Sequence, residues 1–506
     1  MGNVLGKRSM NRRTFGAVSA GTGVAIATGL TASAKQSSPE ASPVAGGPES
    51  QVLLTGLLDP RFIEIDGTDI YFTESGSGGD DPVILNVGEG TPEATEPVSM
   101  RGNTGKVSRL SADGTITEIA NDLISYTFGA NGEIVGAAGI ALDGQGNVLV
   151  AVGSPGPYIS DLPRNGEEGV VLKINIDTGE REIIGDLLQW ELDNNPDPAT
   201  YDSNPYGMAL LDGIAYVADA GGNSIIAVDT TTNEVSTFAV PGGFETEMFG
   251  EGGNPGRGGA QEIDSVPSSV SVGPDGRLYV AYTTGGPFPA GIAPVDAFSA
   301  DGTEERVVEG LTMSSDIAFD STGRMYVSIV SSDMVAGGPG QIVRIEDDGS
   351  YVVVIDGLAM PAGIAFDADD NLYVIENSSI VPGGGSLVKY SGVVDAAGTT
   401  GTGETDATPV ASSDTPAGDF HIDMVDTAFE PNALTIPANT DVGITFENKG
   451  FLAHDFVLDD PKVVSDVLGN GHTTEVTLNL APGEYTFYCS QVGHRALGME
   501  GKLTVE

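Results

Sequence analysis

A sixfold internal repeat between residues 51 and about 393 constrains the fold of this 506-residue chain more than any other feature. Each unit begins with a short apolar strand, which is followed by a polar turn such as Pro274–Arg277. A second strand then follows, as in Leu278–Val280. The second residues of the six first strands are Ile63, Ile140, Met208, Val270, Ile317 and Ile364. Their spacing predicts six copies of one all-β unit.

Six such units predict a six-bladed β-propeller over residues 51–393, because radial closure protects the edges of many short strands. A third strand is visible in every unit, for example Gln341–Ile345. The sixth unit lacks a fourth strand after Tyr390. Gln51–Leu57 resembles Val352–Leu358, the fourth strand of the fifth unit. We therefore expect the N-terminal segment to complete the sixth blade and close the ring.

The repeat region also resembles a known family. Asn204–Gly207 with Tyr216–Asn223, and Val266–Val280 with Gly286–Gly291, are similar to propellers named after the biosynthesis of the pigment scytonemin. The resemblance covers most of residues 51–390. It implies a propeller fold and an exported location, and it implies little chemistry.

Residues 1–34 are predicted to be an export signal that is not part of the fold. Arg12–Phe15 precedes a mildly apolar run from Gly16 to Leu30, and Ala32–Ala34 fits a cleavage site. This pattern resembles a twin-arginine signal, and an ordinary arginine-rich secretory signal is the alternative. The run is short and weakly apolar for a transmembrane helix, although an uncleaved signal could remain as a membrane anchor. Residues 35–50 predict a disordered tether.

The C-terminal part of the chain has a different composition. Residues 394–418 are rich in Gly, Thr and Ser and predict a flexible linker. Residues 419–506 predict a second all-β domain. The only cysteine and all four histidines lie after residue 420, so the propeller region offers no Cys or His ligand. A c-type haem needs a Cys-x-x-Cys-His motif, and a binuclear copper site needs two bridging thiolates. A trinuclear copper site needs more histidines than this chain has. One cysteine and four histidines therefore exclude all three sites.

Four side chains of the second domain form a metal-ligand set. Cys489, His494 and Met499 share one loop, and His454 lies upstream. Strand alternation places Cys489 at the end of the face that carries Tyr485, and the loop returns the next two ligands to that end. A thiolate, two imidazoles and a weak axial thioether are the donors of a blue-copper electron-transfer centre.

Some alternatives to this ligand set remain. The carbonyl of Ala453 could replace Met499 as the axial ligand. His421 lies at the start of the domain and His472 lies in a turn, and we expect both to be ordinary solvated side chains. A metal held by protein at all four positions has no place for a substrate, so the set favours electron transfer over catalysis at the metal.

Phe420–Glu506 resembles a cupredoxin of the plastocyanin and auracyanin type along its whole length. The segments that carry the resemblance are Phe429–Ala438, Val442–Gly450 and Thr477–Tyr488. The resemblance implies a Greek-key β-sandwich with one type 1 copper ion. The predicted fold class is therefore all-β, a six-bladed β-propeller followed by a cupredoxin Greek-key β-sandwich.

The net charge of the chain limits which partners it can bind. With 22 basic and 72 acidic residues the formal charge is −50, so nucleic-acid binding is excluded by repulsion. A basic redox partner protein, bound cations, a salty habitat and plain solubility are the readings that remain. The export signal predicts an extracytoplasmic location, with contact to a membrane only through an uncleaved signal or a partner complex.

The propeller allows two classes of function. It is a docking scaffold for the copper domain, or it is an enzyme, an oxidoreductase or lactonase-like, whose electrons pass to the copper. A third reading is copper sequestration without electron transfer. A Ca²⁺ site built from oxygen ligands remains compatible with the propeller sequence. The polar strand-end residues to consider, which could equally shape turns, are Asn204, Tyr206, Asp219, Asn223 and Asp316.

Overall fold

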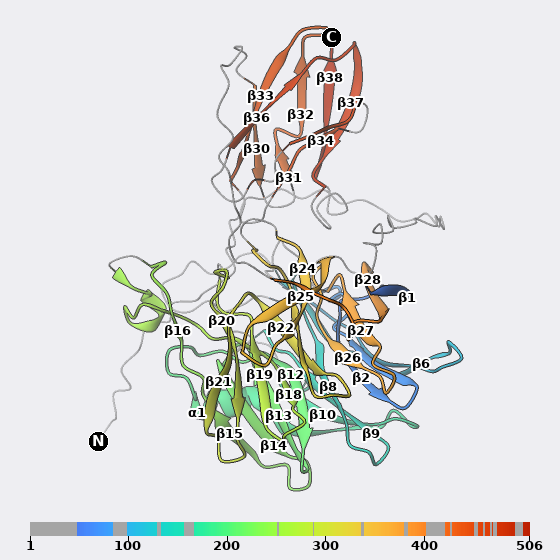
Figure 1. Ribbon diagram of the computed structural model, residues 1–506, viewed down its shortest axis with the longest axis vertical. Coiled ribbons are helices and arrows are strands. Elements are labelled where there is room, and N and C mark those ends of the chain that lie inside the picture. Colours follow the sequence, from blue (N-terminus) through green and yellow to red (C-terminus); the bar gives the residue numbers. More distant parts are fainter. Residues whose placement is uncertain are drawn as a thin grey trace.

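The computed structural model gives two separate sets of β-sheets along the chain (Figure 1). It describes residues 48–83, 99–128, 133–155, 166–249, 252–286, 288–334, 338–378, 383–400, 420–425, 428–449, 454–458, 461–465, 468, 473–490 and 499–506. The predicted signal and nearly all of the predicted tether lie outside these residues. Among the described residues, no helix is long and apolar enough to span a membrane.

The first three blades are antiparallel sheets in chain order. Blade 1 contains β2 (Pro60–Asp66), β3 (Asp69–Glu74), β5 (Ser99–Leu110), β6 (Ile116–Phe128) and β7 (Glu133–Val135), with β4 (Asp81–Val83) paired to β5. Blade 2 contains β8 (Ala137–Leu142), β9 (Asn147–Val152), β10 (Val170–Asn175) and β11 (Arg181–Asp186). Blade 3 contains β12 (Pro205–Leu211), β13 (Ile214–Asp219), β14 (Ser224–Asp229) and β15 (Val235–Ala239).

The last three blades repeat this pattern. Blade 4 contains β18 (Pro267–Val272), β19 (Leu278–Tyr282), β20 (Ala293–Phe298) and β21 (Glu304–Leu311). Blade 5 contains β22 (Ser314–Phe319), β23 (Met325–Ile329), β24 (Gly340–Ile345), β25 (Tyr351–Leu358) and β29 (Thr399–Thr400). Blade 6 contains β26 (Ile364–Phe366), β27 (Leu372–Glu376), β28 (Gly385–Ser391) and β1 (Glu49–Leu57). The six-bladed propeller is thus present.

The inner strands form the ring. Each of β2, β8, β12, β18, β22 and β26 contacts the inner strands of both neighbouring blades, and β26 contacts β2. Glycine permits this approach: a Cβ on Gly139, Gly207 or Gly363 would lie 2.3–2.5 Å from a carbonyl oxygen of the next inner strand. These three glycines occupy the same position of the repeat. Any larger residue there would push the blades apart.

The N-terminal strand closes the ring as predicted. β1 pairs antiparallel with β28, with Gln51 opposite Lys389 and Leu57 opposite Gly385. The strand begins at Glu49, two residues before the expected start. Its residue Leu57 is buried in the core between blades 1 and 6. The first and last strands of the propeller therefore meet in one sheet.

Two insertions were not anticipated from the repeat. Helix α1 (Leu187–Asn194) follows blade 2, and the Asp186 side chain caps it by accepting from the Gln189 N–H. A small hairpin of β16 (Phe244–Glu245) and β17 (Glu262–Ile263) encloses the 3-10 helix η3 (Pro255–Arg257). Both are short additions to an otherwise regular blade pattern.

The predicted linker at 394–418 begins too early. Val393 and Ala396 are buried against blades 5 and 6, and Arg344 donates a hydrogen bond to the Ala396 carbonyl at 2.9 Å. β29 then pairs with Val352 and Val353 of β25. The Gly- and Thr-rich composition predicted a linker because it contains few apolar residues. Two of these residues, Val393 and Ala396, are nevertheless buried.

The C-terminal unit is a sandwich of two sheets. One contains β31 (Ala428–Glu430), β30 (Phe420–Val425), β33 (Val442–Asn448) and β36 (Thr473–Leu478). The other contains β32 (Ala433–Ile436), β38 (Glu500–Val505), β37 (Gly483–Tyr488), β34 (Val457–Leu458) and β35 (Val463–Val464). One apolar cluster fills the space between them.

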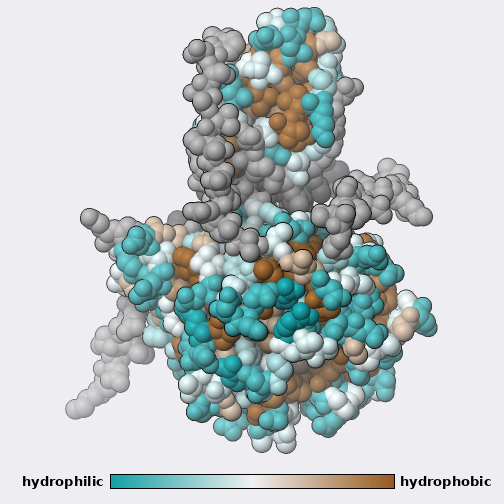
Figure 2. Space-filling model, viewed as in Figure 1, coloured by the Kyte–Doolittle hydropathy of each residue, from teal (hydrophilic) through white to brown (hydrophobic). Residues whose placement is uncertain are grey.

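Hydrophilic residues cover much of the visible propeller face (Figure 2). The large exposed apolar side chains that the described residues include, such as Val52, Ile116 and Val464, come from different strands. Single exposed apolar side chains of this kind are normal on a protein surface.

Candidate metal centre

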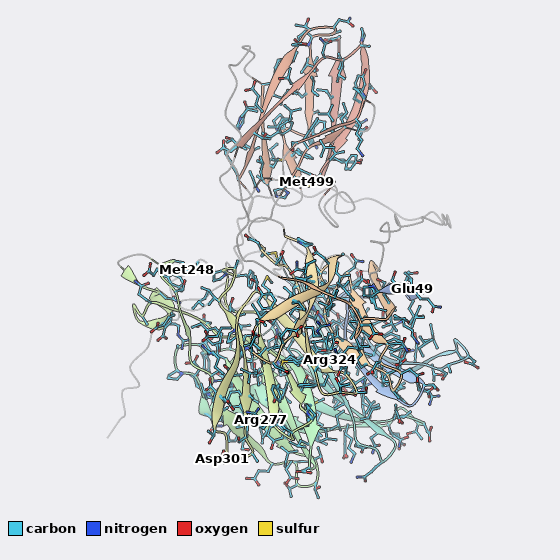
Figure 3. The ribbon with its side chains drawn as sticks, in the orientation of Figure 1. Glu49, Met248, Arg277, Asp301, Arg324 and Met499 are labelled. Atoms are coloured by element: carbon cyan, nitrogen blue, oxygen red, sulfur yellow. The ribbon has the colours of Figure 1, made fainter. Side chains whose placement is uncertain are left out.

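Cys489 lies directly after β37 and is fully buried. Its backbone N–H donates to the Met499 carbonyl at 3.1 Å, immediately before β38 begins. The β37–β38 pairing therefore holds the thiol and the thioether at the same end of the sandwich, where Figure 3 labels Met499. Met499 is also fully buried.

His454 comes to the same end from a different segment. Its backbone forms an isolated β-bridge with Leu468. The His454 N–H donates to the Leu468 carbonyl at 3.0 Å, and the His454 carbonyl accepts from the Leu468 N–H at 2.7 Å. The Asn448 amide also donates to that carbonyl, at 2.6 Å. His454 thus precedes β34 and is held by an isolated β-bridge. Its Nδ1 lies 3.9 Å from Cys489 Sγ.

Aromatic packing fixes the two segments that carry these ligands. Phe456 lies two residues after His454, and Phe487 lies two residues before Cys489. Their ring centroids are 5.4 Å apart, and the ring of Phe446 lies 4.6 Å from that of Phe456. The site is therefore walled by rigid apolar groups, which exclude water.

A buried carboxylate ties the same two segments together. Asp455, which follows His454, is 2% exposed. One of its oxygens accepts from the Ser490 N–H at 2.6 Å, and the other accepts from the Ser490 hydroxyl. Because Ser490 follows Cys489, these bonds set the position of the histidine segment against the cysteine. Sequence analysis did not identify this pair.

The donor set fits copper. A thiol, an imidazole and a thioether converge in a buried apolar cluster, and an ion with bonds of about 2.0–2.3 Å to each atom could bridge the 3.9 Å between Sγ and Nδ1. Soft sulfur donors together with imidazole favour copper over hard cations. His494 and the alternative ligand Ala453 lie outside the described residues, as does His472.

Replacing Asp455 by Asn should raise the reduction potential of a bound copper ion by an amount on the order of tens of millivolts. The variant removes a buried negative charge beside two ligand segments, so it disfavours the more positive oxidised ion. The measurement is a redox titration of the copper-loaded variant. Glu484→Gln removes an exposed charge of β37 and is the control, which should leave the potential unchanged. A fall in potential for Asp455→Asn would contradict the argument.

The five propeller candidates are engaged within the fold. Asp219 accepts from the Ser203 hydroxyl at 2.7 Å and from the N–H groups of Asn204 and Gly222. The Asn204 side chain accepts from the Ser154 N–H at 3.3 Å. These contacts shape the start of blade 3, in agreement with the turn-shaping alternative.

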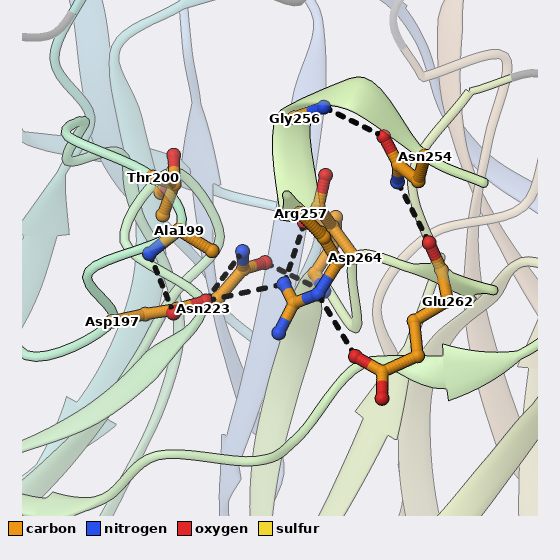
Figure 4. A network of polar contacts seen from close by, with 11 residues as sticks. Asp197, Ala199, Thr200, Asn223, Asn254, Gly256, Arg257, Glu262 and Asp264 are labelled. Carbon is orange, nitrogen blue, oxygen red and sulfur yellow. Dashed lines mark hydrogen bonds and ion pairs between the residues drawn. The ribbon is translucent and has the colours of Figure 1, made fainter. Parts of the chain in front are cut away.

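Asn223 belongs to a network that attaches the β16–β17 insertion to blade 3 (Figure 4). Its amide donates to Asp197 at 3.2 Å, and its oxygen accepts from the Val266 N–H. The Arg257 guanidinium reaches Asp197 at 3.3 Å and Asp264 at 2.7 Å. Arg257 thus connects carboxylates from both sides of the insertion.

Tyr206 and Asp316 lie on inner strands. The Tyr206 hydroxyl accepts from the Arg61 guanidinium at 2.7 Å, and Arg61 also pairs with Asp59. Asp316 accepts from the N–H groups of Ile317 and Ile364 at 2.9 Å each. Asn204 and Asp219 therefore share one hydrogen-bond group, the other three candidates belong to different groups, and a Ca²⁺ ion in the propeller stays a prediction.

Glu64 is a titratable residue of the inner ring that the sequence did not reveal. Burial, reinforced by the charge of Asp316, raises the pKa of Glu64 to about 8. Burial also raises the pKa of Asp316 to about 7, against the hydrogen bonds that it accepts. Glu64 of blade 1 and Asp316 of blade 5 are therefore both harder to ionise than ordinary carboxyl groups.

These raised pKa values make the stability of the propeller depend on pH. The pKa of Glu64 is higher in the folded state than in the unfolded state, so folding favours the protonated carboxyl group. Its contribution to stability is therefore fully present below about pH 4.5 and is lost as pH rises towards 8. Glu64→Gln should therefore increase the free energy of unfolding by on the order of 1 kcal/mol or more at pH 8 and change it little at pH 4.5. Thermal unfolding at both pH values measures this. Glu182→Gln, which changes an exposed residue of β11, is the control, and an equal gain at both pH values would contradict the assignment.

Comparison with known proteins identifies the C-terminal unit. Residues 403–505 match the model of the cupredoxin-like domain family. This unit is a cupredoxin-like domain. Cys489, His454 and Met499 are buried residues of this domain. No curated protein matches the chain.

Several solved structures are similar to parts of the chain. Reduced auracyanin from Roseiflexus castenholzii shares 22% identity over 17% of this chain and 95% of its own, with a TM-score of 0.17. Auracyanin A, a blue copper protein from Chloroflexus aurantiacus, shares 25% over 17% and 97%, with a TM-score of 0.16. A streptogramin B lyase shares 16% over 68% and 97%, with a TM-score of 0.37. The fold assignment rests on the sheets and on the cupredoxin match, and the resemblance to scytonemin-associated propellers stays a prediction.

Proposed function

We propose that this chain is an exported type 1 copper electron-transfer protein whose propeller serves as a docking scaffold. The observation that carries the proposal is the buried group of Cys489, His454 and Met499, with Sγ and Nδ1 3.9 Å apart. His494 is proposed as the fourth ligand from its place in the same loop. One bound copper ion would supply reversible one-electron chemistry.

The residues of the domain would support electron transfer by holding the copper ligands in fixed positions. Phe446, Phe456 and Phe487 exclude water from the thiol and imidazole. The bonds between Asp455 and Ser490 fix the two ligand segments against each other. A rigid set of donors suits both oxidation states and so limits rearrangement during electron transfer.

The scaffold role of the propeller is supported by the hydrogen bonds that its polar strand-end residues accept from the fold. Asp219, Asn223 and Asp316 accept hydrogen bonds from the fold, and the propeller region contains no His or Cys. An oxidoreductase or lactonase-like activity is the alternative, and the carboxyl groups of Glu64 and Asp316, whose pKa values are raised, are the groups that it could use as a base. Export rests on the twin-arginine-like segment of residues 1–34.

The absorption spectrum of the Cu(II)-loaded full chain tests the copper proposal. Thiolate ligation should produce an intense visible charge-transfer band. A colourless copper complex would contradict electron transfer and favour copper sequestration.

The acidic surface favours a basic redox partner. With a formal charge of −50, association with a cationic electron carrier should slow markedly as ionic strength rises. Stopped-flow kinetics against a basic cytochrome measures this. A rate independent of salt would contradict electrostatic docking.

A further inference from the structure

The outer face of the β30–β33 sheet carries a mixed cluster of a histidine, carboxylates and a lysine. His421 and Asp423 are two residues apart on β30, whereas Ile422 and Met424 between and beside them are buried in the core. Parallel pairing places Glu447 of β33 directly opposite Asp423. The three polar side chains therefore share the solvent face, and the sheet separates them from Cys489 and Met499, which belong to the apolar cluster inside the sandwich.

The ligand atoms of this cluster converge. His421 Nε2 lies 2.6 Å from Asp423 Oδ1 and 3.5 Å from Glu447 Oε2. All three candidate ligand atoms lie within 4.8 Å of one another. A metal ion with bonds of about 2.0–2.2 Å to imidazole nitrogen and carboxylate oxygen fits such separations after small side-chain rotations.

A positive charge already occupies the cluster. Lys449 Nζ lies 3.1 Å from the Asp423 carboxylate and 3.6 Å from Glu447 Oε2. Burial acts to raise the pKa of Asp423, and the hydrogen bonds from Lys449 and His421 outweigh it and lower this pKa. The Lys449 side chain is 48% exposed, so its ammonium group can move into solvent.

Neighbouring strands add negative charge to the same face. Glu430 of β31 lies opposite Asp423, and Glu475 of β36 lies opposite Thr445, the residue that pairs with His421. Both glutamates are exposed. Their field would concentrate cations at the cluster.

We propose that His421, Asp423 and Glu447 bind a divalent transition-metal ion, of the class of Zn²⁺ or Cu²⁺, in exchange for the Lys449 ammonium. The imidazole favours this class over Ca²⁺ and Mg²⁺, which take oxygen ligands. Three protein ligands leave at least one position for water. The site is independent of the type 1 centre.

The test is titration of the full chain, loaded with one equivalent of Cu(II), with Zn²⁺ by isothermal calorimetry, with the visible spectrum recorded in parallel. We expect one Zn²⁺ per chain in addition to weak surface binding, with the spectrum unchanged. His421→Ala should weaken this binding at least tenfold. Lys449→Ala should strengthen it several-fold, because the competing cation is removed. Glu484→Gln, an exposed carboxylate of the other sheet, is the matched control.

The variants distinguish a built site from general attraction by an acidic protein. Equal weakening by His421→Ala and Glu484→Gln, or no effect of His421→Ala, would mean an adventitious ion only and would overturn the proposal. A change in the visible spectrum with Zn²⁺ would place the ion at the type 1 ligands and would overturn it as well. Because these residues are on the surface, circular dichroism should show all variants folded.

Discussion

Replacing Cys489 with serine is expected to abolish the intense visible band of the Cu(II)-loaded protein almost completely. The band requires a thiolate bound to copper, and a serine hydroxyl cannot supply this donor. Because serine is of similar size to cysteine, the substitution leaves no large cavity and the sandwich should survive the change. Absorption and electron paramagnetic resonance spectra of the two proteins provide the measurement.

His421→Ala is the matched control for this experiment. It removes a different potential copper ligand from the same domain, one that lies on the outer sheet face. The control should keep the blue band at full intensity. A Cys489→Ser protein that stays blue, or a His421→Ala protein that loses its colour, would contradict the assignment of the centre.

Deleting residues 48–57 is expected to destabilise the propeller by more than about 3 kcal/mol. The deletion removes β1 and leaves the edge of β28 unpaired. It also removes Leu57 from the core between blades 1 and 6, together with the partly buried Leu53 and Leu54. Loss of one buried leucine alone typically costs about 2–5 kcal/mol. Denaturant unfolding of the two proteins measures the difference.

The control truncation starts the chain at residue 48 and keeps β1 intact. It removes only the predicted signal and tether, so its stability should equal that of the longer chain. We also expect the β1 deletion to aggregate through the exposed edge of β28. Equal unfolding midpoints for the two truncations would show that ring closure does not depend on β1.

Much of the propeller could be predicted from its sequence because each blade repeats the same strand and turn pattern. The similarity of Gln51–Leu57 to a fourth strand even predicted ring closure, which the pairing with β28 confirms. Helix α1 and β29 were missed since each occurs once, outside the repeat. The N-cap Asp186 and the helix-forming run after it were the available signal for α1.

The candidate metal donors are visible in the sequence, whereas the residues that hold them in place are not. Cys489 and Met499 share one loop, so their chemistry is visible as a motif. The Asp455–Ser490 pair joins residues 35 positions apart, and neither residue type suggests a role by itself. Glu64 alternates with apolar residues like an exposed strand residue, and only the closed ring shows that Asp316 lies near enough to influence it.

The most direct test of the account is a redox titration of the copper-loaded full chain, followed at its visible band. We predict complete and reversible bleaching on one-electron reduction, with copper retained through repeated cycles, because the buried donors of His454, Cys489 and Met499 suit both oxidation states. Release of copper on reduction, or a band that does not respond to potential, would contradict a type 1 electron-transfer centre.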